Sequence, residues 1–277
     1  MTNDAGLEAT FWGVRGSTPC CGPHVERFGG NTPCLEVRCG TERLIFDAGS
    51  GLRNLGHAWS DQGVGRAHMF LTHFHLDHVM GLPFFKPFFE EGNALTVMAG
   101  RHDSQCCLRN AIKRLFSPPL LPVCVDMFKA KVEFGDLSAG DTHTIGDGIK
   151  VRTAPLNHPD GATAYRVDYR DKSVSYVTDT EHKDKTLDEN ILKLIDGTDL
   201  FIYDAMFTDE EYEAHRGFGH STFTQGLRLA EEAKVKKYIP FHHHPSHDDH
   251  FLERIEGGLR ERFPGTVMAA EGLKLAA

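Results

Sequence analysis

The segment that most constrains this chain is Thr72-His73-Phe74-His75-Leu76-Asp77-His78, in which four potential metal ligands lie within six residues. It follows a short apolar run that reads as a strand and precedes a stretch that reads as a helix. His73 and His75 are two residues apart, so in extended backbone their side chains point to the same side. Asp77 and His78 then lie at a helix start, where a carboxylate suits the helix dipole. The alternative interpretation is a solvated polar turn without a ligand, but the strand–turn–helix setting favours a metal site. Imidazole with carboxylate indicates Zn, Mn, Fe or Ni over Ca.

Composition limits what surrounds such a site. The chain has 277 residues, of which 40% are hydrophobic and 25% charged, so it can bury a sizeable core and is not disordered. Thirty basic residues against 39 acidic ones give a net charge of −9. That balance disfavours a broad grip on extended nucleic acid, which needs a dense basic face, but it leaves room for a small anionic substrate.

The compartment is inferred from what the sequence lacks. No apolar run approaches the roughly 20 residues that cross a bilayer, and the polar N-terminus lacks the features of a secretory signal. The seven cysteines include no CxxC motif. Reduced thiols, a cytoplasmic location and no membrane contact are therefore expected.

Strand and helix patterns alternate along the chain. Closely spaced early strands, a strand-rich middle and helices after each half predict an α/β fold of two sheets packed face to face with helices outside. The length suits one large domain or two small ones, and because no linker stands out, one domain over residues 1–277 is the expectation. The expected strands are Leu7–Val14, Pro33–Cys39, Glu42–Phe46, His68–Leu71, Leu95–Ala99, Ile149–Thr153, Ala164–Asp168, Ser173–Val177, Leu200–Tyr203, Tyr238–Phe241 and Thr266–Ala269. The expected helices are Asp103–Phe116, Leu187–Ile195, Thr222–Ala233 and Asp249–Arg262.

Three later positions follow strands in the same way: His158 in Leu-Asn-His-Pro, Asp179 in Tyr-Val-Thr-Asp-Thr, and His242 in Ile-Pro-Phe-His. Together with the histidine segment, their order resembles the metallo-β-lactamase superfamily over most of the chain. The resemblance implies an αββα sandwich of two mixed sheets flanked by helices, with two divalent metal ions at one edge. Zinc is the first expectation and manganese or iron the alternatives. The resemblance assigns His73, His75 and His158 to the first metal, assigns Asp77, His78 and His242 to the second, and makes Asp179 the bridging ligand.

The last ligand has rivals, because Phe241 is followed by three consecutive histidines. His242 is favoured over His243 and His244, since a residue at the strand end should face the metals. His247 and His250, with two intervening aspartates, are expected to form a solvated turn and a helix cap. A second metal site there is the minority interpretation.

The resemblance also implies the reaction, which is metal-assisted hydrolysis by a hydroxide that bridges the metals and that Asp77 orients. The segments Tyr203–Phe207 and Gly219–Thr222 resemble the ribonuclease Z and PhnP-like phosphodiesterase branch. His220 matches a histidine that binds the scissile phosphate or protonates the leaving oxygen in that branch. The structural alternative makes His220 a helix-entry residue.

The substrate expectation is a small phosphodiester or a cyclic nucleotide. The chain lacks the Gly- and basic-rich arm with which ribonuclease Z grips tRNA. Its segment Met80–Glu133 is apolar and proline-punctuated, which suits a lid or a dimer surface, and dimers are common in this branch. The alternatives are a thioester or lactone hydrolase on the same fold, and a ribonuclease Z-like RNA-processing nuclease. A flavodiiron redox protein is disfavoured, because His75 stands where that branch has a carboxylate.

Two further features are assigned from their positions. Arg15 offers either a fork to phosphate or a structural contact at a strand end, and the Gly29–Thr32 loop leaves the same choice open. Asp47 ends a strand near the expected metal edge, so we expect it to orient a ligand histidine.

Overall fold

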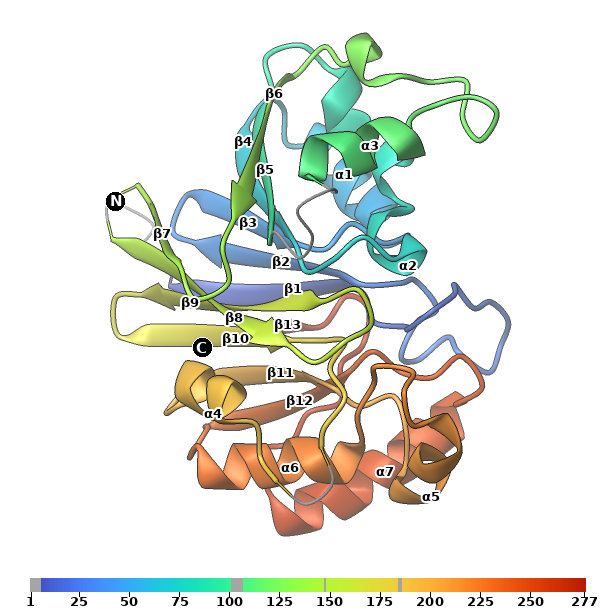
Figure 1. The fold of residues 1–277 in the computed structure, drawn as a ribbon, viewed down its shortest axis with the longest axis vertical. Helices are drawn as coiled ribbons and strands as arrows, with labels where there is room; N and C mark the ends of the chain where they lie inside the picture. The colour runs from blue at the N-terminus through green and yellow to red at the C-terminus, as the bar shows by residue number, and fades with distance from the viewer. Residues whose placement is uncertain (1–5, 101–106, 147, 184–185) are drawn as a thin grey trace.

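The computed structural model describes residues 6–100, 107–146, 148–183 and 186–277, and it forms two mixed β-sheets packed face to face (Figure 1). The first sheet has the order β13-β1-β2-β3-β4-β5-β6, with β1 (Leu7–Gly13), β2 (Cys34–Cys39), β3 (Glu42–Phe46), β4 (Arg66–Leu71), β5 (Ala94–Gly100), β6 (Lys131–Leu137) and β13 (Lys274–Ala276). The second has the order β12-β11-β10-β9-β8-β7, with β7 (Thr142–Ile145), β8 (Ile149–Leu156), β9 (Ala162–Tyr169), β10 (Lys172–Val177), β11 (Leu200–Asp204) and β12 (Lys237–Phe241).

Aromatic side chains join the two sheets. Phe46 of β3 stacks on Phe70 of β4 with ring centroids 5.3 Å apart. From the second sheet, Tyr165 and Tyr176 approach Phe46 to 5.5 and 5.9 Å. All four rings are buried and belong to one hydrophobic cluster fed by both sheets. Large apolar areas buried in tilted contacts stabilise the interface between the sheets.

Helices cover the outer face of each sheet (Figure 1). The first sheet is covered by α1 (Leu52–Ser60), α2 (Leu76–Val79), α3 (Leu108–Leu115) and the 3₁₀ turns η1 (Leu82–Phe84), η2 (Lys86–Phe89) and η3 (Val125–Met127). The second sheet is covered by α4 (Glu189–Ile195), α6 (Phe223–Glu232) and α7 (Asp249–Arg262), while α5 (Asp209–Tyr212) and η4 (Glu213–His215) follow β11. The predicted αββα sandwich is thereby confirmed. Every helix in the described ranges is too short or too polar to span a bilayer.

Some elements differ from the sequence-based prediction. Helix α1 was missed because Gly56 interrupts its apolar pattern. Gly56 instead lies on the buried face, where a Cβ would come within 2.9 Å of Phe85, so the glycine permits close packing. The strands β6 and β7 were also missed, and both are edge strands.

The predicted closing strand Thr266–Ala269 is wrong. Thr266 makes an isolated bridge to Tyr238, and Ala269 N–H donates to the carbonyl of Pro240. The segment therefore lies along the edge of β12 without forming a strand, and its buried apolar residues explain the prediction. Helix Asp103–Phe116 is observed as α3, with residues 103–106 outside the described part of the chain.

Candidate metal centre

The histidine segment begins directly after β4, at a buried turn that hydrogen bonds to Asp47 hold in place. Thr72 donates through its N–H and hydroxyl to the carboxylate of Asp47, at 2.8 and 3.0 Å. The next residues turn away from the sheet, and His75 becomes the N-cap of α2. Asp77 lies in the first turn of that helix, as predicted. This local structure places the histidine segment at the edge between the two sheets.

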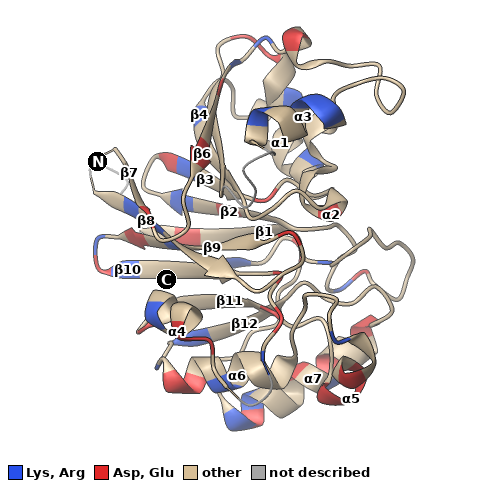
Figure 2. Ribbon diagram, in the orientation of Figure 1, with Lys and Arg blue, Asp and Glu red and all other residues tan. Residues whose placement is uncertain are grey.

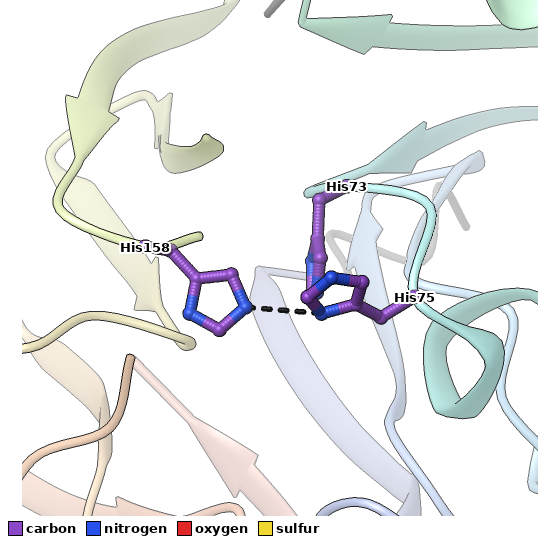
Figure 3. Close-up of side chains that lie close together, drawn as sticks. All are labelled: His73, His75 and His158. Atoms are coloured by element: carbon purple, nitrogen blue, oxygen red, sulfur yellow. Dashed lines mark hydrogen bonds between the residues drawn. The ribbon is translucent and has the colours of Figure 1, made fainter. Parts of the chain in front are cut away.

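The first donor cluster consists of His73, His75 and His158, whose ligand atoms lie within 4.8 Å of one another. Figure 3 shows the three rings turned toward a common point, with His158 entering from the loop after β8. His158 Nε2 lies 3.1 Å from His75 Nδ1. His73 Nε2 is buried with no hydrogen-bond partner. A buried unpaired nitrogen is costly in a protein, and an ion at this point would satisfy it.

The second donor cluster consists of Asp77, His78 and His242. Its three donor atoms are equally spaced: His78 Nε2 lies 3.3 Å from His242 Nε2, and each nitrogen lies 3.3 Å from Asp77 Oδ2. Tetrahedral zinc with bonds of about 2.0–2.2 Å would hold its donor atoms roughly 3.3–3.6 Å apart. The spacing therefore fits one shared ion of this kind.

Asp179 lies between the two clusters with one oxygen toward each. Its Oδ1 is 3.8 Å from His73 Nε2 and 3.9 Å from His158 Nε2. Its Oδ2 is 3.2 Å from His78 Nε2 and 3.4 Å from His242 Nε2. This is the arrangement expected of a carboxylate that bridges two ions.

The three candidates for the last ligand take different positions. His242 points into the second cluster, whereas His243 Nε2 donates to the carbonyl of Ala269, 2.8 Å away. His244 Nδ1 contacts Ser246 Oγ at 2.7 Å. His247 Nε2 lies 2.9 Å from a carboxylate oxygen of Glu211. The structure brings all seven predicted ligands together and leaves the following histidines outside.

The expected helix cap is present, but the expected solvated turn is wrong at His247, whose side chain is buried. Asp248 caps α7 by accepting from Phe251 N–H at 2.7 Å, and Asp249 accepts from Arg27 N–H at 2.9 Å. Among the residues that the structure describes, every metal-capable cluster belongs to the centre already defined, so the minority interpretation of a second site finds no support.

Burial and charge set the protonation states at the centre. Burial, reinforced by His78, lowers the pKa of His73 well below its ordinary value, and burial also lowers the pKa of His158. Burial alone would raise the pKa of Asp179, but the charges of His242, His78 and His73 outweigh it and hold that pKa well below its ordinary value. His73, His158 and Asp179 are therefore in the neutral and ionised forms that bind metal. His78 differs: burial would lower its pKa, but the charges of Asp179, Asp77 and Asp47 outweigh burial and raise that pKa well above its ordinary value, so a bound ion would have to displace its proton.

His220 lies against the centre on the side of the second sheet. Its Nδ1 is 3.0 Å from Asp204 Oδ2 and 3.8 Å from Asp179 Oδ1. Burial would lower the pKa of His220, but the charge and hydrogen bond of Asp204 outweigh burial and raise it to about 9. His220 also forms a donor cluster with Asp179 and His242, so the geometry allows it to act as a proton donor or as a further ligand.

Asp204 lies in the segment Tyr203–Phe207 that the sequence analysis singled out, but the sequence analysis assigned it no role of its own. It is fully buried at the end of β11 and accepts from the N–H groups of Thr180 and Met206, both at 3.2 Å. Its signal was its position, because Asp204 ends the strand between β10, which leads to Asp179, and β12, which leads to His242.

A buried layer orients His78. Asp47 Oδ2 contacts His78 Nδ1 at 2.8 Å, the contact expected if Asp47 orients this predicted ligand. Tyr176 donates its hydroxyl to the same oxygen at 2.9 Å, and this contact was not anticipated. Because these contacts fix Nδ1 of His78, the other ring nitrogen, Nε2, points into the second cluster.

Glycine is required at two places beside the ligands. A Cβ on Gly16 would lie 2.6 Å from the ring of His242, and a Cβ on Gly219 would lie 2.1 Å from His158 Nδ1. The Gly219 carbonyl is also 2.8 Å from that nitrogen and orients the ring.

Arg15 takes the structural alternative. Its side chain is fully buried, and it donates to the carbonyls of Gly29, His244 and His247 at 2.8, 3.2 and 2.6 Å. It therefore holds the loop after β12 against the Gly29–Thr32 loop. In the same N-terminal region, Ser17 N–H donates to Asp77 Oδ2 at 2.8 Å.

Comparisons with known proteins agree with this geometry. A family model for the β-lactamase superfamily domain matches residues 42–243. A ribonuclease Z of Haloferax volcanii is 25% identical over 97% of this chain and 94% of its own. The metallo-β-lactamase fold protein YhfI from Bacillus subtilis covers 98% of this chain and 100% of its own at 18% identity, with a TM-score of 0.73. A diphosphatase from the PhnP family covers 98% of both chains at 19% identity, with a TM-score of 0.70. Since the family model spans most of the sequence and the fold and donor clusters agree with it, the chain belongs to the β-lactamase superfamily and is a metal-dependent hydrolase of the metallo-β-lactamase fold.

Proposed function

We propose that this protein is a phosphodiesterase with two divalent metal ions. His73, His75 and His158 would hold the first ion, and Asp77, His78 and His242 the second, with Asp179 between them. Zinc suits these donors best, with manganese or iron as alternatives. The observation that carries the proposal is Asp179, whose two oxygens face the two donor clusters at 3.2–3.9 Å. Two such ions would supply Lewis acidity toward a phosphoryl oxygen and make water nucleophilic at neutral pH.

The protein's own residues provide positioning and a proton. Asp77 is fixed by Ser17 N–H, so its carboxylate can orient an incoming water. His220 is held through Nδ1 by Asp204, which leaves Nε2 to donate a proton to the leaving oxygen. The raised pKa of His220 keeps that proton in place near neutral pH.

Charge and length favour a small substrate. The net charge is −9, and Figure 2 shows basic residues on α3, acidic residues on α5 and both signs along α6. The alignment to the Haloferax ribonuclease Z runs over 326 positions, although this chain has 277 residues, so the relative carries insertions that this chain lacks. We therefore propose a small phosphodiester or a cyclic nucleotide as the substrate.

RNA processing is the second candidate, favoured by the curated relatives named ribonuclease Z that align along nearly the whole chain. Hydrolysis of a thioester or lactone is the third, because the same centre can polarise an acyl carbonyl. One domain over residues 1–277, a cytoplasmic location and a homodimer also stay predictions.

Metal analysis joined to a substrate panel tests the proposal. We expect close to two divalent ions per chain in the purified protein, and hydrolysis of bis(p-nitrophenyl) phosphate and cyclic nucleotides. A precursor tRNA and a set of thioesters and lactones complete the panel. Cleavage of thioesters or lactones without any phosphodiester turnover would reject the proposal, and selective cleavage of the tRNA would favour the second candidate.

A further inference from the structure

A group of aromatic rings extends from the metal centre toward solvent. Phe207 follows β11, His215 and Phe218 follow α5, and His244 follows β12. Phe207 stacks on His215 with centroids 4.5 Å apart, and it approaches His244 to 5.6 Å. His215 meets Phe218 edge-on at 5.6 Å. We call these four residues the aromatic patch.

The aromatic patch begins at the residue proposed to donate the proton. Phe207 lies edge-on to His220 with centroids 6.2 Å apart. His220 in turn stacks beside His242 of the second donor cluster at 5.0 Å. Phe207 is itself buried, so a substrate group that leaves toward His220 would make contact with the patch at its exposed end, Phe218.

Phe218 forms the outer end of the patch on a fixed turn. Its side chain is 61% exposed, and single exposed apolar residues are ordinary. Its setting is less ordinary, because Gly217 and Gly219 on either side both adopt positive φ, at 88° and 87°. The N–H groups of both glycines donate to the carboxylate of Glu181, at 2.8 and 3.0 Å to Oε2. The backbone that carries the exposed ring is thus fixed on both sides of Phe218.

Charge around the patch limits what it can bind. Helix α5 carries Asp209, Glu210 and Glu211 between Phe207 and His215, and Figure 2 shows this helix as acidic. The nearby Arg216 forms an ion pair with Glu213 at 2.8 Å. Such a surface disfavours a second phosphate and favours an uncharged ring. Stacking of a base on an aromatic side chain does not depend on base identity, because every base has a π face.

We propose that the aromatic patch binds an aromatic ring, of the nucleobase type, on the leaving-group side of the substrate. The inference rests on the proposed phosphodiesterase function and narrows its substrate to diesters that carry such a ring. Phe218 would act as a specificity-determining residue, contacting the ring and leaving the phosphate to the metal centre.

Direct binding tests this without any turnover. Adenosine 5′-monophosphate and ribose 5-phosphate differ by the base alone, so their dissociation constants for the metal-loaded protein isolate the ring. We expect the wild-type protein to bind the nucleotide about tenfold more tightly than the sugar phosphate. Phe218→Ala should lose most of that preference with the affinity for ribose 5-phosphate unchanged, and Phe218→Trp should retain it.

Phe84→Ala is the matched control, because Phe84 is 60% exposed and makes no ring contact with the centre among the described residues. It should keep the wild-type preference. Equal binding of both probes by the wild type, binding of neither, or an intact preference in Phe218→Ala would overturn the proposal. The phosphodiester panel is read separately. A protein that hydrolyses diesters but shows no effect of Phe218→Ala fails only this inference. A protein that turns over no diester yet loses base preference in Phe218→Ala fails only the proposed function.

Discussion

The two sides of the metal centre are built in different ways. On the side of the first sheet, His73, His75, Asp77 and His78 come from one continuous segment that runs from the turn after β4 into α2. On the side of the second sheet, His158, Asp179 and His242 follow three different strands. Strands β10, β11 and β12 are parallel, and β8 runs the same way because β9 is antiparallel to both β8 and β10. Their carboxyl ends therefore meet at one edge, so this side depends on the whole sheet, whereas the other depends on one local turn.

Both sides share one backbone feature at their strand ends. Asp47, Asp179 and His242 have φ values of 59°, 58° and 63°, in the left-handed region that non-glycine residues rarely adopt. Each such residue costs of order 1–3 kcal/mol and persists where surrounding contacts fix it. Contacts at the sheet edge thus offset the conformational cost of holding these side chains in place. This holds on both sides of the centre, although one side comes from a local segment and the other from separate strands.

The largest expected effect is at Asp179, where the two sides meet. Asp179→Ala should leave fewer than one ion per chain and slow phosphodiester hydrolysis by roughly 10³–10⁴, because several kcal/mol of charge stabilisation would be lost. Metal analysis and steady-state kinetics measure both. Asp171→Ala, at an exposed turn, is the control and should retain both ions. Full metal content in Asp179→Ala would contradict the bridging position.

The next effect separates two adjacent histidines. His242→Ala should weaken chiefly the second ion, by more than the roughly 10–100-fold that loss of an outer partner costs, as read by chelator competition. His243→Ala should keep both ions and instead lower the free energy of unfolding by about 1–3 kcal/mol, because the buried carbonyl of Ala269 loses its partner. Loss of metal in His243→Ala with full metal content in His242→Ala would show that His243, and not His242, is the ligand that follows β12.

A smaller effect on the rate is expected at His220, which lies beside the centre but belongs to neither the first nor the second donor cluster. His220→Ala should keep both ions and lose roughly 10²–10⁴ in rate with an alkoxide leaving group, and less with p-nitrophenolate, which needs no proton. Asp204→Asn should change the rate in the same direction by a smaller factor, since it removes the charge that holds Nδ1. Loss of an ion in His220→Ala would make His220 a ligand, in line with its cluster with Asp179 and His242.

The same contrast explains what the sequence could predict. The metal-binding role of the segment from His73 to His78 could be predicted because its potential ligands are close in sequence and follow a strand. His158, Asp179 and His242 were assigned through a family resemblance, since no local pattern marks them. The segment Tyr203–Phe207 was singled out by the same resemblance, but the contact of Asp204 with His220 was not predicted, because it depends on the order of β10, β11 and β12, which spacing along the chain does not reveal. Helix α1 was missed because a glycine that serves close packing looks like a helix breaker.

The smallest catalytic effect is expected at Arg15, where a buried cation could be mistaken for a phosphate-binding group. Its guanidinium is bound to the carbonyls of Gly29, His244 and His247, so it joins the N-terminal region to the loop after β12. Arg15→Lys should lose part of this geometry, because an ammonium cannot reproduce the planar fork. We expect about 2 kcal/mol lower stability, or roughly 5 °C in Tm, with KM for a phosphodiester unchanged. Arg53→Lys, on the exposed face of α1, should change neither quantity. Thermal unfolding and steady-state kinetics of the two variants distinguish the structural role from substrate binding. A raised KM at unaltered Tm in Arg15→Lys would show that Arg15 binds the substrate. The N-terminal region would then contribute a charged group to the site, in addition to the two sides that carry the ligands.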